Sequence, residues 1–151
     1  MKTLNVAWFP CHPHHAFELA VRIERWPELL PHYRWVRFHE GGSENGGLVE
    51  MAARRDFGHF AWPVWWVSRM TPDPARRTIR YTHVKGVTKG MEVLWALEPA
   101  GSGTRVAITH EWAGGPRLIG TLFVEAIADR TLRHLAQHAE GRGSRWSGAE
   151  R

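Results

Sequence analysis

The chain has few of the features that mark secreted or membrane-spanning proteins. It contains 151 residues but a single cysteine, so no internal disulfide can form and a reducing cytoplasm is the expected location. Its longest apolar run, Phe60–Val67, is far shorter than the roughly 20 residues that a membrane-spanning helix needs. The opening MKTLNVAWFP lacks the hydrophobic region of a signal peptide and instead predicts a strand. We therefore expect a cytoplasmic protein with no integral membrane segment.

Long runs of one charge are also missing. The formal net charge is +5, but the densest basic stretches are the pairs Arg54-Arg55 and Arg76-Arg77. A nucleic-acid reader usually carries a basic stripe or a recognisable motif, and neither is present. The composition therefore argues against nucleic-acid binding, while the positive charge would suit an acidic partner protein.

Tryptophan, by contrast, is abundant. Nine tryptophans in a chain of this length indicate an unusually aromatic core or a pocket walled by rings. The length fits one domain, which we place at residues 1–140. The last residues, 141–151, are rich in Gly, Ser and Arg and are expected to form a disordered tail.

The hydrophobic periodicity predicts one strand, two short helices, six further strands and a long final helix. Turn residues such as GGSENGG, TPDPA and PAGSG separate the strands, which indicates an antiparallel meander. We expect the strands at Thr3–Phe9, Tyr33–Glu40, Leu48–Phe57, Phe60–Met70, Arg77–Val84, Met91–Glu98 and Thr104–Trp112, and the helices from Pro13, at Arg25–Leu30 and at Arg117–Ala139. The predicted fold is α+β: a seven-stranded curved antiparallel sheet wrapped around the C-terminal helix, with a cavity between them.

Alternation along the strands indicates which side chains face that cavity. His110 shares a face with Val106 and Ile108, so it is either a hydrogen-bonded core histidine or an acid, base or ligand contact in a pocket. Tyr81 and His83 share a second inward face. In the strand Leu48–Phe57, Arg55 belongs to the more apolar face. This arginine is therefore expected either at the cavity rim or on the surface, with its aliphatic stem packed on apolar atoms.

The strand FAWPVWWVSRM is apolar on both of its faces. Trp66 and Ser68 alternate against Trp65 and Val67, so the outer pair needs its own cover, and a homodimer partner could supply it. Pro63 cannot donate to a sheet ladder, which indicates an edge position or a bulge.

The stretch CHPHH places one thiol and three imidazoles in five positions at the turn into the first helix. A zinc site usually draws four ligands from two segments, and adjacent helical histidines diverge by about 100°. We therefore expect a structural or incidental role for Cys11, His12, His14 and His15 and no functional metal site, with adventitious metal binding as the alternative.

Several stretches resemble the helix-grip superfamily of START-like lipid carriers and polyketide cyclase/dehydrase proteins (SRPBCC), above all its aromatase/cyclases. They are ERWPELLPHY (24–33), WWVSRMTPDPARRTIRY (65–81), KGMEVLWALEPAGSGTRVAITHEW (89–112) and the final helix. The resemblance implies a pocket lined at Trp26, Leu30, Tyr33, Ser68, Met91 and Trp95. Two positions depart from the aromatase/cyclase pattern: Met70 replaces an inward arginine, and His110 stands where a glutamine is usual.

The resemblance implies one of two functions. As a cyclase, the chain would use Tyr33 and Ser68 to hydrogen-bond substrate oxygens and His110 or His83 to move protons, with no metal or cofactor. Its substrate would be a hydrophobic, polyketide-type molecule delivered by an acyl carrier protein. Alternatively, the cavity would serve a non-enzymatic carrier or sensor of a lipid, quinone or other hydrophobic ligand. In either case we expect the ligand to touch Trp26, Leu30, Trp66, Tyr81, Met91, Trp95 and Arg55.

Overall fold

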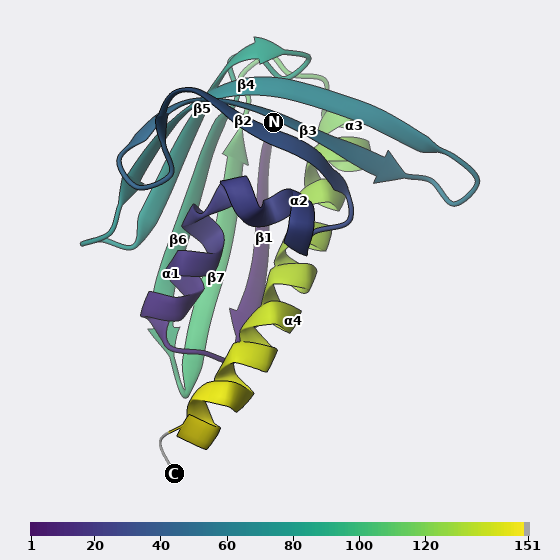
Figure 1. Cartoon of the computed structure of the whole chain (residues 1–151). Helices are drawn as coiled ribbons and strands as arrows, with labels where there is room; N and C mark the ends of the chain where they lie inside the picture. Colours follow the sequence, from purple (N-terminus) through teal and green to yellow (C-terminus); the bar gives the residue numbers. More distant parts are fainter. Residues whose placement is uncertain (150–151) are drawn as a thin grey trace.

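The chain folds as one curved sheet around one long helix (Figure 1). The computed structural model describes the backbone of residues 1–149 and the side chains of residues 1–140. The strands are β1 (Lys2–Phe9), β2 (Tyr33–Gly42), β3 (Gly46–Asp56), β4 (Ala61–Asp73), β5 (Thr78–Gly86), β6 (Glu92–Ala100) and β7 (Gly103–Glu111). The helices are α1 (Pro13–Val21), η1 (Ile23–Arg25), α2 (Trp26–Leu29), α3 (Arg117–Ile119), η2 (Gly120–Val124) and α4 (Glu125–Ala149). The predicted α+β architecture is confirmed.

The sheet has the order β1-β7-β6-β5-β4-β3-β2, and every neighbouring pair is antiparallel. Strands β2 to β7 form the predicted meander. The segment α1–η1–α2 carries the chain from β1 at one edge to β2 at the other, and it packs against both the sheet and α4. In Figure 1 the short helices lie beside α4 beneath the sheet, so α4 and these helices together cover its concave face.

The final helix differs in detail from the uninterrupted helix predicted over Arg117–Ala139. Its first part consists of the short α3 and of η2, a π-helical turn, before regular α-helix begins at Glu125. A π-turn accommodates one extra residue and is frequent beside functional sites. Helix α4 extends to Ala149, and a disordered tail over 141–151 stays a prediction, because the side chains after residue 140 lie outside the described part.

The core lies between the sheet and α4, and it contains the side chains that alternation assigned to the inside. Met91, Val93, Trp95 and Leu97 of the β6 region are buried. On α4, Leu132 and Leu135 are fully buried against this face. An apolar stripe at helical spacing thus meets apolar sheet residues at period two, and this match holds the two layers together.

Strand β4 is interior to the sheet, yet its first half behaves as an edge. Pro63 pairs with Arg54 of β3, whereas β4 pairs with β5 only from Trp66 onward. The missing N–H of Pro63 therefore costs no ladder bond to β5. On the outer face Val67 is buried within the chain, while Trp65 remains 40% exposed. A dimer partner over this face stays a prediction.

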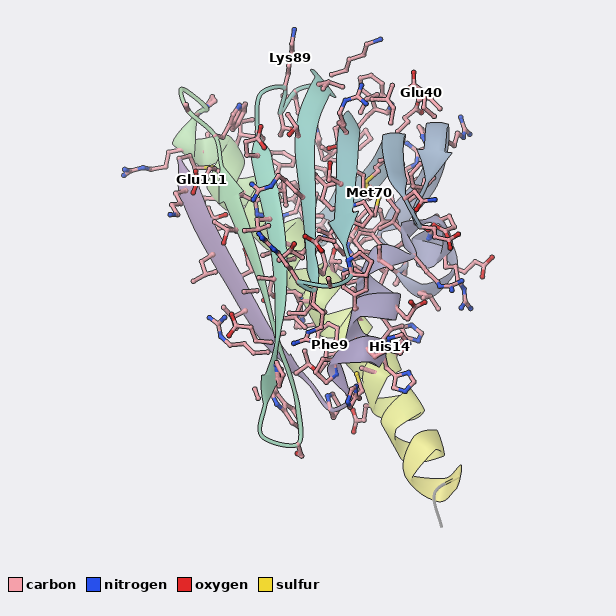
Figure 2. All side chains as sticks on the ribbon, turned by 90° about the vertical axis from the view of Figure 1, so that its left-hand side faces the viewer. Phe9, His14, Glu40, Met70, Lys89 and Glu111 are labelled. Carbon is pink, nitrogen blue, oxygen red and sulfur yellow. The ribbon has the colours of Figure 1, made fainter. Side chains whose placement is uncertain are left out.

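The CHPHH stretch starts α1. The backbone N–H of His14 donates to Nδ1 of His12 at 3.2 Å, so His12 is the N-cap of the helix, with Pro13 at its first position. Cys11 is buried, and its carbonyl accepts a hydrogen bond from Thr104. Figure 2 shows His14 on α1, well below Lys89, which lies at the top of the view. Among the described residues, no three His, Cys, Asp or Glu side chains cluster as metal ligands would.

No helix in the described part of the chain is long and apolar enough to cross a membrane.

Candidate functional site

A cavity of about 280 Å³ lies between the concave face of the sheet and the helical segment 119–131. Its walls come from α2, β2, β3, β4, β5, β6, β7, the β5–β6 loop and the π-turn. Trp62 and Val87, both more than half exposed, mark the open end. The lining comprises Trp26, Tyr33, Met51, Trp62, Pro63, Val64, Trp65, Trp66, Tyr81, His83, Val87, Thr88, Met91, Val93, Trp95, Ile108, His110, Ile119, Phe123, Val124, Ile127, Ala128 and Thr131.

Aromatic rings form the inner walls. Trp26 is anchored by a hydrogen bond from its Nε1 to the carbonyl of Leu19 at 3.1 Å. Its ring contacts Trp95 at 5.6 Å and Tyr33 at 5.1 Å between centroids. Because each ring rests on a neighbour, the wall is preorganised to receive a flat apolar molecule.

Tyr33 brings a hydroxyl to this aromatic wall. It begins β2, and a β-bulge between Tyr33 and Trp35 offsets the pairing with β3 at this position. Burial raises the pKa of the Tyr33 hydroxyl well above its ordinary value, and the nearby Thr131 side chain offsets a smaller part of this effect. The hydroxyl therefore stays protonated at neutral pH.

His83 lies on β5 and is held on two sides. Its Nδ1 lies 2.6 Å from Oγ1 of Thr88, and its ring stacks on Trp66 with an interplanar angle of 4°. Burial, with the smaller effect of nearby His110, lowers the pKa of His83 to about 3. The ring is therefore neutral at pH 7 and keeps one unprotonated nitrogen.

His110 lies on β7, two strands from His83. His110 as a whole is half-buried, but its Nδ1 atom is buried and has no hydrogen-bond partner in the described part of the chain. Burial lowers the pKa of His110 to about 4. The sequence left open whether His110 is a hydrogen-bonded core histidine or a contact in a pocket. The first interpretation requires a hydrogen-bonding neighbour, and no side-chain hydrogen bond to the His110 ring is observed among residues 1–140.

Most, but not all, of the predicted site residues line the cavity. Trp26, Tyr33, Trp66, Tyr81, His83, Met91, Trp95 and His110 do so. Ser68 and Leu30 do not: both side chains have no exposed surface and lie in the packed interior beside the cavity. The resemblance placed both side chains in the pocket, but burial in the core does not by itself bring a side chain to the cavity lining.

Arg55 is also absent from the cavity lining. Its Nε donates to the carbonyl of Leu122 at 2.6 Å, and its guanidinium lies over the ring of Phe57. It borders a separate polar groove between β3 and α4, where Arg130 pairs with Asp56. The alternative given for Arg55, a surface role with its stem packed on apolar atoms, describes this arrangement better than contact with a ligand.

Three polar residues near the site are absent from the set of site residues predicted from the sequence. Thr88 comes from the β5–β6 loop, and Thr131 occupies a position on the otherwise apolar stripe of α4. His32 follows Pro31 in the loop before β2 and is fully buried. Only the spacing of Thr131, four residues after Ile127 and four before Leu135, could have marked one of them as inward-facing.

The lining contains no Asp, Glu, Lys or Arg side chain among the residues that the structure describes. Met70 is buried and Arg69 is exposed, so no arginine on β4 reaches the interior in place of the one that the resemblance leads us to expect. Polar contact with a ligand is thus limited to hydroxyls, neutral imidazoles and backbone groups.

A curved sheet gripping a helix around an aromatic cavity defines a helix-grip protein, and solved structures share this fold. The Zhui aromatase/cyclase from Streptomyces sp. R1128 matches with a TM-score of 0.79, 17% identity and 94% coverage of each chain. Ginseng major latex-like protein 151 from Panax ginseng matches with a TM-score of 0.77 and 14% identity, over 92% of this chain and 97% of that one. At these identities the likeness establishes the fold alone.

The di-domain ARO/CYC StfQ from the steffimycin biosynthetic pathway has a TM-score of 0.76 and 17% identity, over 95% of this chain and 52% of that one. No curated protein matches the sequence. The family model described as polyketide cyclase/dehydrase and lipid transport matches residues 10–140. The chain belongs to this family.

Proposed function

We propose that the chain binds a flat hydrophobic molecule of polyketide type in its cavity and promotes aldol-type ring closure and dehydration. The observation that carries this proposal is that Tyr33, His83 and His110 line one aromatic cavity without hydrogen-bonding one another. If these groups bonded among themselves, the cavity would be an apolar tunnel suited only to carriage. Their separate placement leaves each free to meet a different part of a folded substrate.

The proposed chemistry uses neutral groups. An unprotonated imidazole nitrogen of His110 or His83 takes a proton from the carbon between two ketones of the substrate. The resulting enolate carbon attacks a second ketone carbon, a C–C bond forms, and the imidazolium returns the proton to the new alkoxide oxygen. Loss of water then gives the ring double bond, while Tyr33 hydrogen-bonds a substrate oxygen.

The aromatic walls supply most of the expected rate effect. Trp26, Trp66 and Trp95 confine a flexible chain so that the nucleophilic carbon meets one carbonyl. Such positioning can contribute about 7–11 kcal/mol to lowering a barrier. The net charge of +5 supports an acidic acyl carrier protein as the substrate donor, in the cytoplasm.

The direct test incubates the chain with a carrier-bound poly-β-ketone and separates the cyclised products by chromatography. We expect one ring pattern in excess over the spontaneous mixture. His110→Ala should lower its rate about 10²-fold, the lower end of the effect of a general acid or base. Tyr33→Phe should lower it about tenfold, the value of one hydrogen bond.

His39→Ala is the matched control, because His39 is an exposed histidine that pairs with Glu50 away from the cavity lining. It should leave the product pattern unchanged. The same product mixture with and without wild-type protein would exclude the cyclase proposal.

A second candidate function, carriage of a hydrophobic ligand without chemistry, is favoured by one observation. No charged side chain lines the described cavity, so nothing there would strongly polarise a ketone. Native mass spectrometry of the freshly purified chain separates the two candidates, because a carrier should retain a bound lipid or quinone. A ligand-free chain that cyclises the poly-β-ketone would exclude the carrier function.

A further inference from the structure

Exposed apolar side chains gather around the open end of the cavity. We call them the mouth patch, and they are Phe60 and Trp62 beside the β3–β4 turn, Val87 in the β5–β6 loop, and Leu118 and Leu122 on α3 and η2. The other large apolar side chains that are exposed in the described part of the chain are Leu4, Val6 and Trp8 on β1 and Trp65 on β4. More than half of these exposed side chains thus stand around one opening.

Ring contacts join the mouth patch to the cavity wall. The centroid of the Trp62 ring lies 6.4 Å from that of Phe123. Phe60 stacks on Phe57 at 5.2 Å, and Phe57 in turn lies 5.9 Å from Phe123. Phe123 itself lines the cavity, as does Val87. The patch is therefore a continuous rim of the cavity.

The helical segment at the rim is apolar on two sides. Ile119 and Phe123 line the cavity, whereas Leu118 and Leu122, each one position earlier, are exposed. A helix that is hydrophobic all round is normally buried all round. The outward leucines therefore indicate a second apolar surface that covers this segment from outside the chain.

The charges beside the mouth patch are almost all positive. The segments 54–62, 85–90 and 116–122, which carry the patch, contain Arg54, Arg55, Lys85, Lys89 and Arg117. Their one acidic residue is Asp56, and its carboxylate pairs with Arg130 of α4. In Figure 2 the side chain of Lys89 projects outward at the top of the view. An apolar centre is thus surrounded by positive charge.

We propose that the mouth patch docks the chain on the surface of an anionic lipid bilayer, with the open end of the cavity facing the lipid. A bilayer interface accepts exposed Trp, Phe and Leu side chains without a shaped pocket, and its anionic headgroups attract Lys and Arg. An acidic protein would meet the charges, but it would also need a surface shaped to fit five protruding side chains. The inference goes beyond the proposed function, because a docked chain could either transform or carry its ligand.

Vesicle sedimentation tests the docking. Vesicles of phosphatidylcholine and phosphatidylglycerol in equal parts present an anionic surface, and vesicles of phosphatidylcholine alone present a neutral one. The wild-type chain should bind the anionic vesicles at least tenfold more tightly, because each Lys or Arg near an anionic surface strengthens binding about fivefold. Added salt should weaken this binding, because mobile ions screen the charges.

Matched variants identify the face that docks. Leu118→Ser removes an apolar side chain from the mouth patch, and Leu4→Ser removes a similarly exposed one from β1. Arg117→Gln removes a charge beside the patch, and Arg80→Gln removes an exposed charge from β5. The first variant of each pair should lower the vesicle affinity about fivefold, and the second should leave it unchanged.

The same four variants have a control for folding. None of the four positions lines the cavity. Isothermal titration of 1-naphthol, a flat apolar probe of the cavity, should therefore give the wild-type affinity in each of them.

Fluorescence quenching by brominated lipid locates the docked face directly. Bromine atoms on the acyl chains quench a tryptophan only at close range, so the bound wild-type chain should lose fluorescence through Trp62. Trp62→Phe should abolish this loss. Trp8→Phe, which changes a similarly exposed ring on β1, should retain it.

The outcomes separate this inference from the proposed function. Absence of binding to the anionic vesicles, or quenching that persists in Trp62→Phe and disappears in Trp8→Phe, overturns the docking proposal and leaves the ligand cavity standing. Binding of an acyl carrier protein but of no vesicle, weakened by Arg117→Gln, would assign the mouth patch to a protein partner instead. Vesicle binding by a chain that fails to bind 1-naphthol would support the docking and overturn the ligand cavity.

Discussion

Ser68 shows that facing inward and facing a ligand are different properties of a residue. It pairs with Val49 and His83 in the sheet and has no exposed surface, yet it is absent from the cavity lining. Its hydroxyl has no hydrogen-bond partner among the described residues. A buried hydroxyl without a partner costs about 1–3 kcal/mol of stability, so Ser68 weakens the fold and brings no polar atom to the cavity.

Ser68→Ala should therefore stabilise the chain by about 1 kcal/mol, because it removes an unpaired polar group at almost constant volume. Urea denaturation followed by tryptophan fluorescence measures the change, and 1-naphthol affinity should stay at the wild-type value. Thr104→Val is the comparison: Thr104 is equally buried but donates to the Cys11 carbonyl at 2.9 Å, so its loss should destabilise. Weaker ligand binding in Ser68→Ala would return Ser68 to the site.

At the scale of elements, strands and helices could be predicted because their periods differ. Alternation in Met91–Leu97 defined an inward face that the structure confirms, and an apolar stripe defined the final helix. The π-turn at Gly120–Val124 had no such signal, because the apolar spacing over this segment predicts a regular helix. The pattern along one element predicts which of its faces is buried. Whether a side chain on that face reaches the cavity depends on how the sheet and the helices pack together.

The same limit applies to the site. His83 and His110 were identifiable because a polar residue on an apolar face stands out in sequence, whereas Tyr33 was assigned to the pocket through the family resemblance. His32 and Thr131 were missed because their importance lies in a contact across 99 positions of the chain. The CHPHH stretch is the opposite case. Its possible metal ligands are prominent in the sequence, but the role observed in the structure is that His12 caps the N-terminus of α1.

For the whole molecule, buried neutral histidines predict a fold that weakens in acid. The pKa of His32 and of His110 is lowered to about 4 and that of His83 to about 3, against an ordinary value of 6.5. Below pH 6.5 the unfolded chain binds these protons and the folded chain does not. This stability is therefore complete above pH 6.5 and is lost as the pH falls toward 4.

Between pH 7 and pH 5 each such histidine should remove about 2 kcal/mol from the free energy of unfolding. Urea denaturation at the two pH values measures the loss. His32→Gln should reduce the pH dependence, while His59→Gln, at an exposed histidine in the β3–β4 turn, should leave it unchanged. A free energy of unfolding that is constant from pH 7 to pH 5 would contradict the burial of these rings in solution.

The ligand cavity itself is tested by filling it. Ala128 lines the cavity, and Ala126, two positions earlier on α4, borders the polar groove beside Arg55 instead. Isothermal titration of 1-naphthol should give one site per chain in the wild type, at least a tenfold weaker site in Ala128→Phe, and wild-type affinity in Ala126→Phe. Undiminished binding by an Ala128→Phe chain with a native circular dichroism spectrum would show that the ligand binds elsewhere.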